Sequence, residues 1–284
     1  GTRSNELSKE TFRKIFGKEY YSFDEGDVHY VVLDDVFYYA RHYAGYIEES
    51  QLEWLENDLR DVKPGSKVVV FMHIPTWSRA ARAGEYGKEE MNKIVGNRRE
   101  LYRILEPYDA HLCTAHEHYA ENYELSDSLF EHVHAPLSGL FWQSFWSMDG
   151  VPWGYYVYTI KNGDISWYYK AVGQDKSVQY TEYAVGEDRH KPDCIVANVW
   201  NYDPKWQVLW YEDGVLQGEM TKFSGWDTTI CNDVDLRREK EFRWKYIGAG
   251  ETQHLFYAKP SRPDAKVEIK VIDRFGNVCK PYKN

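Results

Sequence analysis

The chain has 284 residues, of which 43% are hydrophobic and 28% charged, so it can bury a core and does not resemble a disordered protein. Its net charge of -10 argues against a general attraction for nucleic acid or anionic lipid. No apolar run approaches the roughly 20 residues that span a bilayer. The aromatic content of 17% favours a sheet-rich protein.

The first elements follow from local signals. Ser8 stands where it would cap a helix over residues 9–16, and Gly17 would end that helix. Residues 20–39 have the composition of two strands joined by a turn at 24–27. A helix over 49–62 is expected next, because its leucines recur on one face while the glutamates take the other.

The middle of the chain alternates between strands and a helix. Residues 67–73, KVVVFMH, form an apolar run typical of a strand buried on both faces of a parallel sheet. A helix over 97–108 and a second buried strand over 110–115 follow. This order predicts an α/β layer architecture.

After about residue 135 the sequence pattern changes to hairpins and short strands. Residues 153–172 predict a hairpin with its turn at 161–164, and short strands at sandwich spacing come after it. The polar stretch between these parts is the best boundary, so we expect domains over 1–174 and 175–284.

The four cysteines lie in no C-x-x-C spacing, which argues against a zinc knuckle or thioredoxin-type motif. Three of them fall in the last third of the chain. We interpret them as small buried hydrophobes, with one disulfide as the alternative. The cysteines are Cys113, Cys194, Cys231 and Cys279.

Three histidines follow the predicted buried strands. His73 ends the first strand, and His116 and His118 come directly after the second. Ligand sites of open α/β sheets lie beyond the carboxyl ends of the strands, where the three imidazoles would gather if the strands are parallel neighbours. In an extended segment, the H-x-H spacing would point both side chains the same way. The alternative is that these are ordinary surface or core histidines.

Several segments resemble the calcineurin-like metallophosphoesterases, most closely the bacterial branch with a C-terminal β-sandwich. The similar segments are VVVFMHIP, LCTAHEHYAENYE, YYSFDEGDVHYVVLDD, GYIEESQLEWLENDL and, near the end, VIDRFGN. The resemblance implies an α/β (α+β) fold. It would comprise the C-terminal half of an αββα sandwich over 1–174 and an all-β sandwich domain over 175–284.

The same resemblance implies a metal site. His73 matches the metal-binding histidine of the family's HxP stretch, and His116 and His118 match its G-H-x-H motif. The expected cofactors are divalent Mn, Fe, Zn or Ni, and the expected substrate is a phosphate ester. A secreted or cell-envelope bacterial protein is expected from this branch.

Two departures from the family pattern limit this expectation. The glycine of G-H-x-H is Ala115 here, which is tolerable only where the backbone does not need positive φ. The family motifs D-x-H, G-D and G-N-H-D/E, which precede the YYSF segment in the family, are not found upstream of that segment here. Three histidines cannot hold the two metals of the family's centre without carboxylate bridges. We therefore expect little or no turnover from this chain, and half of the expected ligands are missing.

Three hypotheses stay open. The chain is a metal-dependent phosphoesterase by family, represented by a fragment or a truncated gene product. Alternatively, it is a non-catalytic module that binds a partner or glycan through its β-sandwich or residual cleft. In the third hypothesis, the chain forms an active enzyme when another chain supplies the missing strands.

Four further residues are candidates near the site. Asn122 is positioned to orient His118. The aromatic stretch that contains Trp142, Trp146 and Trp153 would wall a substrate recess or, alternatively, form a packed apolar cluster.

The apolar strand over 67–72 also needs a cover, because the family strands beside it are missing from the sequence. A second copy in a two-fold dimer would supply one. Residues 2–16 folding back over the strand are the alternative.

Overall fold

The computed structural model describes residues 3–79, 91–262 and 264–283. Contacts divide the chain into two units. The first comprises Gly1–Glu117, Asn122–His134 and Ile160–Ile165, and the second comprises His118–Glu121, Ala135–Thr159 and Ser166–Asn284. The predicted domain boundary at residue 174 stays a prediction.

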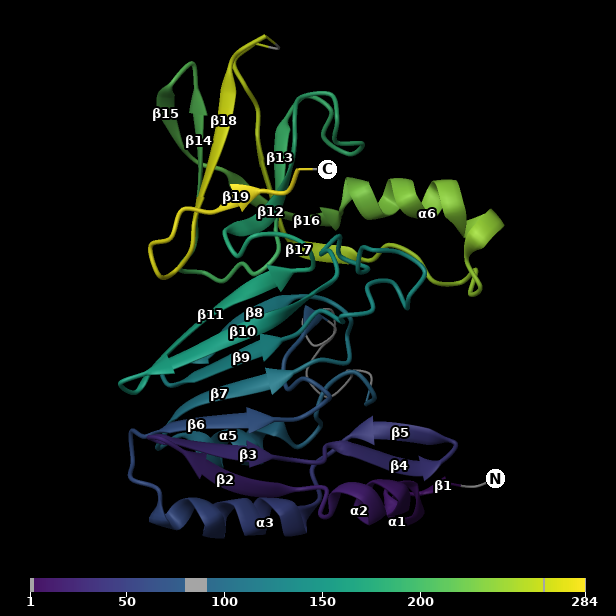
Figure 1. The fold of residues 1–284 in the computed structure, drawn as a ribbon, viewed down its shortest axis with the longest axis vertical. Helices are drawn as coiled ribbons and strands as arrows, with labels where there is room; N and C mark the ends of the chain where they lie inside the picture. Colours follow the sequence, from purple (N-terminus) through teal and green to yellow (C-terminus); the bar gives the residue numbers. More distant parts are fainter. Residues whose placement is uncertain (1–2, 80–90, 263, 284) are drawn as a thin grey trace. The chain divides into compact units, whose positions relative to one another are not determined.

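A six-stranded sheet forms the centre of the first unit, with the strand order β2-β3-β6-β7-β9-β8 (Figure 1). Strands β3, β6, β7 and β9 run parallel, and β2 pairs antiparallel with β3. The strands are β2 (Tyr21–Glu25), β3 (Val28–Val32), β6 (Lys67–Phe71), β7 (Asp109–Thr114), β8 (Glu121–Ser126) and β9 (Leu129–Val133). The predicted α/β architecture with parallel neighbouring strands is confirmed.

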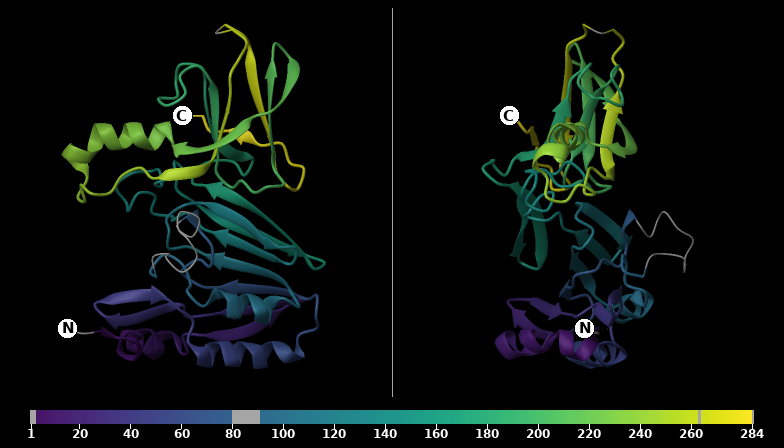
Figure 2. Two further views of the ribbon diagram at one scale, coloured as in Figure 1. Left: turned by 180° about the vertical axis from the view of Figure 1, so that it is seen from behind. Right: turned by 90° about the vertical axis from the view of Figure 1, so that its right-hand side faces the viewer.

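Helices α3 (Glu49–Asp58) and α5 (Arg98–Leu105) pack against this sheet, and the short 3₁₀ helix η1 (Leu59–Asp61) extends α3. Seen from behind in Figure 2, α5 lies in front of the strands. The shared core is apolar because alternate strand residues face the leucine stripes of both helices. Its fully buried members include Leu55, Val68, Val70, Leu101 and Leu112.

The opposite face of the sheet is less covered. Val69 on β6 is 6% exposed, but Phe71 at the end of the same strand is 40% exposed. The prediction that this strand is buried on both faces therefore fails at its last residue.

The N-terminal segment forms two short helices, α1 (Asn5–Ser8) and α2 (Glu10–Phe16). They lie beside a three-stranded sheet made of β1 (Arg3–Ser4), β4 (Val36–Ala40) and β5 (His42–Gly45). The predicted cap at Ser8 is wrong. Ser8 lies inside α1 and donates to the Asn5 carbonyl, so Lys9 takes the cap position of α2. Gly17 ends α2 with a φ of 90°, as predicted.

The second unit contains a β-sandwich. A five-stranded sheet has the order β16-β17-β13-β12-β19, and a three-stranded sheet has the order β15-β14-β18. Its strands are β12 (Val178–Tyr183), β13 (Ile195–Val199), β14 (Gln207–Glu212), β15 (Val215–Glu219), β16 (Thr221–Trp226), β17 (Glu251–Ala258), β18 (Val267–Ile272) and β19 (Lys280–Pro281). Apolar side chains of both sheets, such as Val199, Val208, Phe256 and Val271, form one core. The predicted all-β sandwich is confirmed.

A hairpin and a helix are the remaining elements, and the tip of the hairpin, Ile160–Ile165, is assigned to the first unit. The predicted hairpin is present as β10 (Gly154–Lys161) and β11 (Asp164–Ala171), and Asn162 and Gly163 make its turn with positive φ. Helix α6 (Thr228–Glu241) was not expected, because only short strands were predicted after the hairpin. Among the described residues, no helix combines the length and apolar content needed to cross a membrane. The four cysteines, all of them among the described residues, form no disulfide.

Candidate metal site

His73 follows β6 in a segment that a buried carboxylate holds in place. The backbone amides of His73 and Ile74 donate to the two oxygens of Asp35, at 3.0 and 2.6 Å. Asp35 follows the neighbouring strand β3 and is 1% exposed, and burial raises the pKa of its carboxyl to about 7. Asp35 therefore fixes the backbone from which the His73 ring extends.

A second buried carboxylate fixes the next residues of the same segment. Glu131 on β9 accepts from the amides of Thr76 and Trp77 at 2.7 and 2.9 Å. It also accepts from the hydroxyls of Thr76 and Thr114 at 2.6 and 3.0 Å. Burial raises the pKa of Glu131 to about 7. The segment after His73 is thus tied to the sheet at two points.

His116 follows β7 and meets His73. The amide of Ala115 donates to the His73 carbonyl at 3.0 Å, which brings the two strand ends together. His116 Nδ1 then lies 3.0 Å from His73 Nε2, and His116 Nε2 lies 2.7 Å from the carbonyl oxygen of Asn92. The Tyr43 ring meets the imidazole edge-on at 5.7 Å. The sequence therefore predicted correctly that these two histidines lie together.

The two rings lie within hydrogen-bond distance of each other. The Asn92 carbonyl only accepts, so His116 Nε2 carries the ring proton and Nδ1 presents a lone pair towards His73. Two nitrogens bound at about 2.0–2.1 Å and at a right angle to one metal ion lie about 3.0 Å apart. However, within residues 3–79, 91–262 and 264–283 no group of three or more His, Cys, Asp or Glu side chains could hold a metal ion. The described residues therefore provide a contacting histidine pair but not a complete ligand set.

His118 does not follow the predicted extended geometry. His116 and His118 have φ values of 62° and 60°, in the left-handed region. The expectation that they point the same way from an extended segment is therefore wrong. His118 belongs to the second unit, where its ring stacks on Phe141 at 4.4 Å. Ala115 is not among the residues with positive φ, so its replacement of glycine is tolerated.

The stretch Gly139–Trp142 is also held in an unusual conformation. Phe141 and Trp142 have φ values of 50° and 64°. Of the seven non-glycine residues with positive φ in the described chain, these two and the two histidines make four. Each costs about 1–2 kcal/mol, and such strain concentrates at functional sites. The backbone conformation therefore singles out these two loops as a candidate functional region, independently of the H-x-H motif.

The tryptophans of this stretch differ in burial. Trp142 is 69% exposed, with Trp153 edge-on to it at 5.8 Å. Trp146 is buried and packs against Phe145 and Tyr282 at 5.4 and 5.2 Å. Trp146 thus occupies an apolar cluster, whereas Trp142 is accessible to a ligand.

Asn122 takes part in a buried chain of polar contacts that the sequence did not reveal. Its amide oxygen lies 3.2 Å from His132 Nδ1, and His132 Nε2 lies 3.0 Å from His111 Nδ1. All three side chains belong to adjacent strands of the first unit's sheet. Asn122 therefore orients His132, and its predicted role towards His118 stays a prediction.

Comparison with known families supports the resemblance noted in the sequence. A comparison with curated proteins returns no match. A family profile described as the C terminal of calcineurin-like phosphoesterase matches residues 131–279, just over half of the 284 residues. The chain therefore belongs to the calcineurin-like phosphoesterases, of which it carries the C-terminal region.

Proposed function

We propose that this chain supplies histidine ligands to the metal centre of an enzyme that hydrolyses phosphate esters. The observation that carries the proposal is the 3.0 Å separation between His73 Nε2 and His116 Nδ1. His118 is included in the proposed ligand set because it matches the second histidine of the family's G-H-x-H motif. Imidazole suits divalent Mn, Fe, Zn or Ni.

A bound metal would polarise the phosphoryl oxygens and lower the pKa of a water ligand. The residues of this chain hold and orient the nitrogen donors. Asp35 fixes the backbone of His73, and the Asn92 carbonyl selects the tautomer of His116. We further propose that the exposed Trp142 contacts the substrate and that Trp146 supports its loop from the apolar cluster.

The centre needs ligands beyond these residues. Histidines alone do not balance the charge of two divalent ions, and carboxylate bridges usually do so. The family's G-N-H-D/E motif is not found in the sequence, and the D-x-H and G-D patterns that do occur, such as residues 26–29, lie within or after the YYSF segment and not before it. We therefore expect the chain alone to bind metal weakly and to turn over phosphate esters slowly or not at all.

A hydrolysis assay tests this proposal. The chain is incubated with p-nitrophenyl phosphate or bis-p-nitrophenyl phosphate and with Mn²⁺, Zn²⁺ or Ni²⁺. No metal-dependent turnover is expected from the wild type, His116→Ala or the control His42→Ala, a histidine that lies exposed on β5. Fast turnover that is lost in His116→Ala and kept in His42→Ala would show that the ligand set is already complete.

A binding module is the second candidate function. It is favoured by the incomplete ligand set of the described residues and by a cavity in the second unit. In this case the histidines would be remnants, and the β-sandwich would carry the activity.

A further inference from the structure

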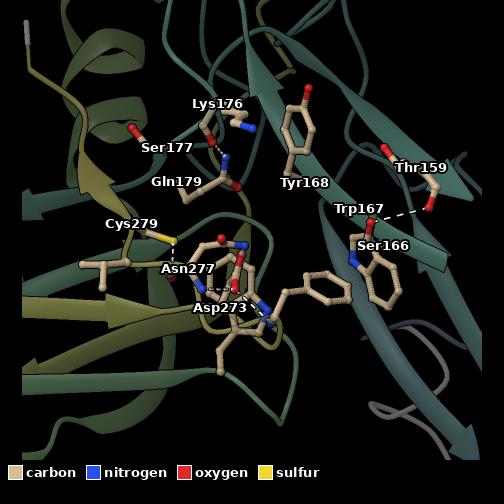
Figure 3. A pocket seen from close by; sticks show the side chains of 13 residues that line it. Thr159, Ser166, Trp167, Tyr168, Lys176, Ser177, Gln179, Asp273, Asn277 and Cys279 are labelled. Carbon is tan, nitrogen blue, oxygen red and sulfur yellow. Dashed lines mark hydrogen bonds between the residues drawn. The ribbon is translucent and has the colours of Figure 1, made fainter. Parts of the chain in front are cut away.

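The second unit contains a cavity of about 490 Å³ whose lining includes none of the candidate metal ligands (Figure 3). It lies between the β10–β11 hairpin and the turn over residues 273–279, which follows β18. Its volume is in the range of about 300–1,000 Å³ that is usual for small-molecule sites. No role in phosphate-ester hydrolysis accounts for it.

Gln179 on β12 gives this cavity a polar group that requires a partner. The side chain is 3% exposed, and its NH₂ group donates to the carbonyls of Tyr169 and Lys176 at 2.6 and 2.8 Å. Both N–H groups of the Gln179 side chain are therefore used, and its amide oxygen lies on the side opposite to these two carbonyls. Within residues 3–79, 91–262 and 264–283, the Gln179 oxygen has no hydrogen-bond partner. A buried acceptor in this state requires an N–H or O–H donor.

Aromatic rings form an apolar wall of the same cavity. Trp167 on β11 and Phe275 in the turn meet edge to face at 5.0 Å. The guanidinium of Arg274 lies over the Trp167 ring at 4.9 Å and helps to hold it. Phe275 is 41% exposed, so its ring is accessible to a ligand. Such rings suit the C–H face of a pyranose.

The charges of the cavity favour a neutral ligand. The Asp273 carboxylate is locked by the amides of Phe275 and Asn277 and by the Asn277 side chain, at 2.8–2.9 Å. It opposes the entry of an anion, while the Lys176 ammonium, 6.0 Å from the Tyr168 ring, opposes the entry of a cation. The Asp273 carboxylate can accept a hydrogen bond from a ligand hydroxyl, and the Lys176 ammonium can donate one to it.

We propose that this cavity binds a neutral sugar unit. A hydroxyl would donate to the Gln179 oxygen, and the apolar sugar face would stack on Phe275. The unpartnered buried acceptor, the accessible ring and the opposed charges each point to this class of ligand, and none of them depends on a metal.

Calorimetric titration with soluble neutral hexasaccharides tests the proposal. The probes are cellohexaose, xylohexaose, mannohexaose, maltohexaose and chitohexaose, each added to the full chain. At least one is expected to bind. Phe275→Ala and Gln179→Leu should each weaken it by at least about tenfold, the scale of one aromatic or hydrogen-bond contact.

Two controls make the outcome decisive. Tyr246→Ala removes an aromatic ring that is 85% exposed outside the cavity, and it should bind like the wild type. His116→Ala should also keep the affinity, which separates this site from the proposed metal centre. The proposal is overturned if no probe binds, or if Phe275→Ala, which is expected to fold because its ring lies at the surface, binds as tightly as the wild type.

Discussion

Asp227 combines two structural tasks in one buried side chain. It caps α6 by accepting from the Ile230 amide at 3.1 Å. Its other oxygen accepts from the Tyr183 hydroxyl at 2.6 Å and from the Asn198 amide at 2.8 Å. Burial raises the pKa of Asp227 from 3.8 to about 6. The cap at the start of α6 is therefore also a titrating group.

The raised pKa of Asp227 makes the free energy of unfolding depend on pH. Because the folded state holds the Asp227 proton more tightly than the unfolded state, the contribution of Asp227 to stability falls as the pH rises from about 4 to 6, by a few kcal/mol at most. Asp227→Asn should lose this dependence. Denaturant unfolding of both proteins between pH 4 and 7 tests it, and parallel curves would contradict it. Tyr183, which packs on Asp227, has a raised pKa and stays neutral in this range.

Gly150 lies directly against the side chain of Asp227. Its φ is 80°, and an added Cβ would overlap the Asp227 carboxylate. Gly163 in the hairpin turn has the same φ, but an added Cβ would meet no atom there. Gly163→Ala should therefore cost only about 1 kcal/mol of unfolding free energy, and Gly150→Ala at least about 3 kcal/mol. Thermal denaturation of both variants measures the difference, and equal losses would show that the loop at Gly150 moves aside.

The sequence revealed His73 and His116 as a pair but not their conformation. Strand ends of a parallel sheet bring such residues together, and this follows from the apolar runs alone. Left-handed φ values at His116 and His118 could not be predicted, because the usual signal is glycine and neither residue is one.

At the scale of elements, the segment after β6 depends on Glu131. Glu131→Ala would leave the Thr76 and Trp77 amides and the Thr114 hydroxyl without their buried acceptor. We expect a loss of about 3–5 kcal/mol in unfolding free energy and faster hydrogen exchange at both amides. Tyr102→Phe removes only the hydroxyl that donates to Thr76, so about 1 kcal/mol should be lost. Similar losses in the two variants would contradict the anchoring role of Glu131.

Strands were easier to predict than α6. The apolar runs of β6 and β7 and the N-G turn of the hairpin are strong local signals. Helix α6 buries only Thr228, Ile230 and Val234, and most of its other residues are polar or charged. Its sequence lacks an apolar stripe, so tertiary contacts and the Asp227 cap determine the helix.

A row of stacked aromatic rings crosses the less covered face of the first unit's sheet. Phe23 stacks on Tyr30 at 5.0 Å, and Tyr30 stacks on Phe71 at 6.4 Å. Phe23 and Phe71 are 47% and 40% exposed, and β2 is an edge strand. The α/β and β-sandwich parts could be predicted from the sequence. What packs on this face of the sheet could not be predicted, because no residue pattern identifies the partner.

We expect a second copy of the chain to cover these rings, because an antiparallel edge strand can pair with its own copy across a two-fold axis. Light scattering should then give the mass of a dimer. Phe23→Ser and Phe71→Ser should shift the protein towards the monomer, and Tyr246→Ala, outside this face, should not. A monomeric wild type at high concentration would rule out the dimer.

The proposed metal centre is tested most directly by X-ray absorption of the chain loaded with Co²⁺ or Zn²⁺. The 3.0 Å separation between His73 Nε2 and His116 Nδ1 predicts a shell with at least two imidazole nitrogens at about 2.0–2.1 Å from the metal. His73→Ala and His116→Ala should each remove one imidazole from this shell, and His42→Ala should change nothing. A wild-type shell of oxygen ligands alone, or a shell that both histidine variants leave intact, would contradict the assignment of these two histidines as ligands.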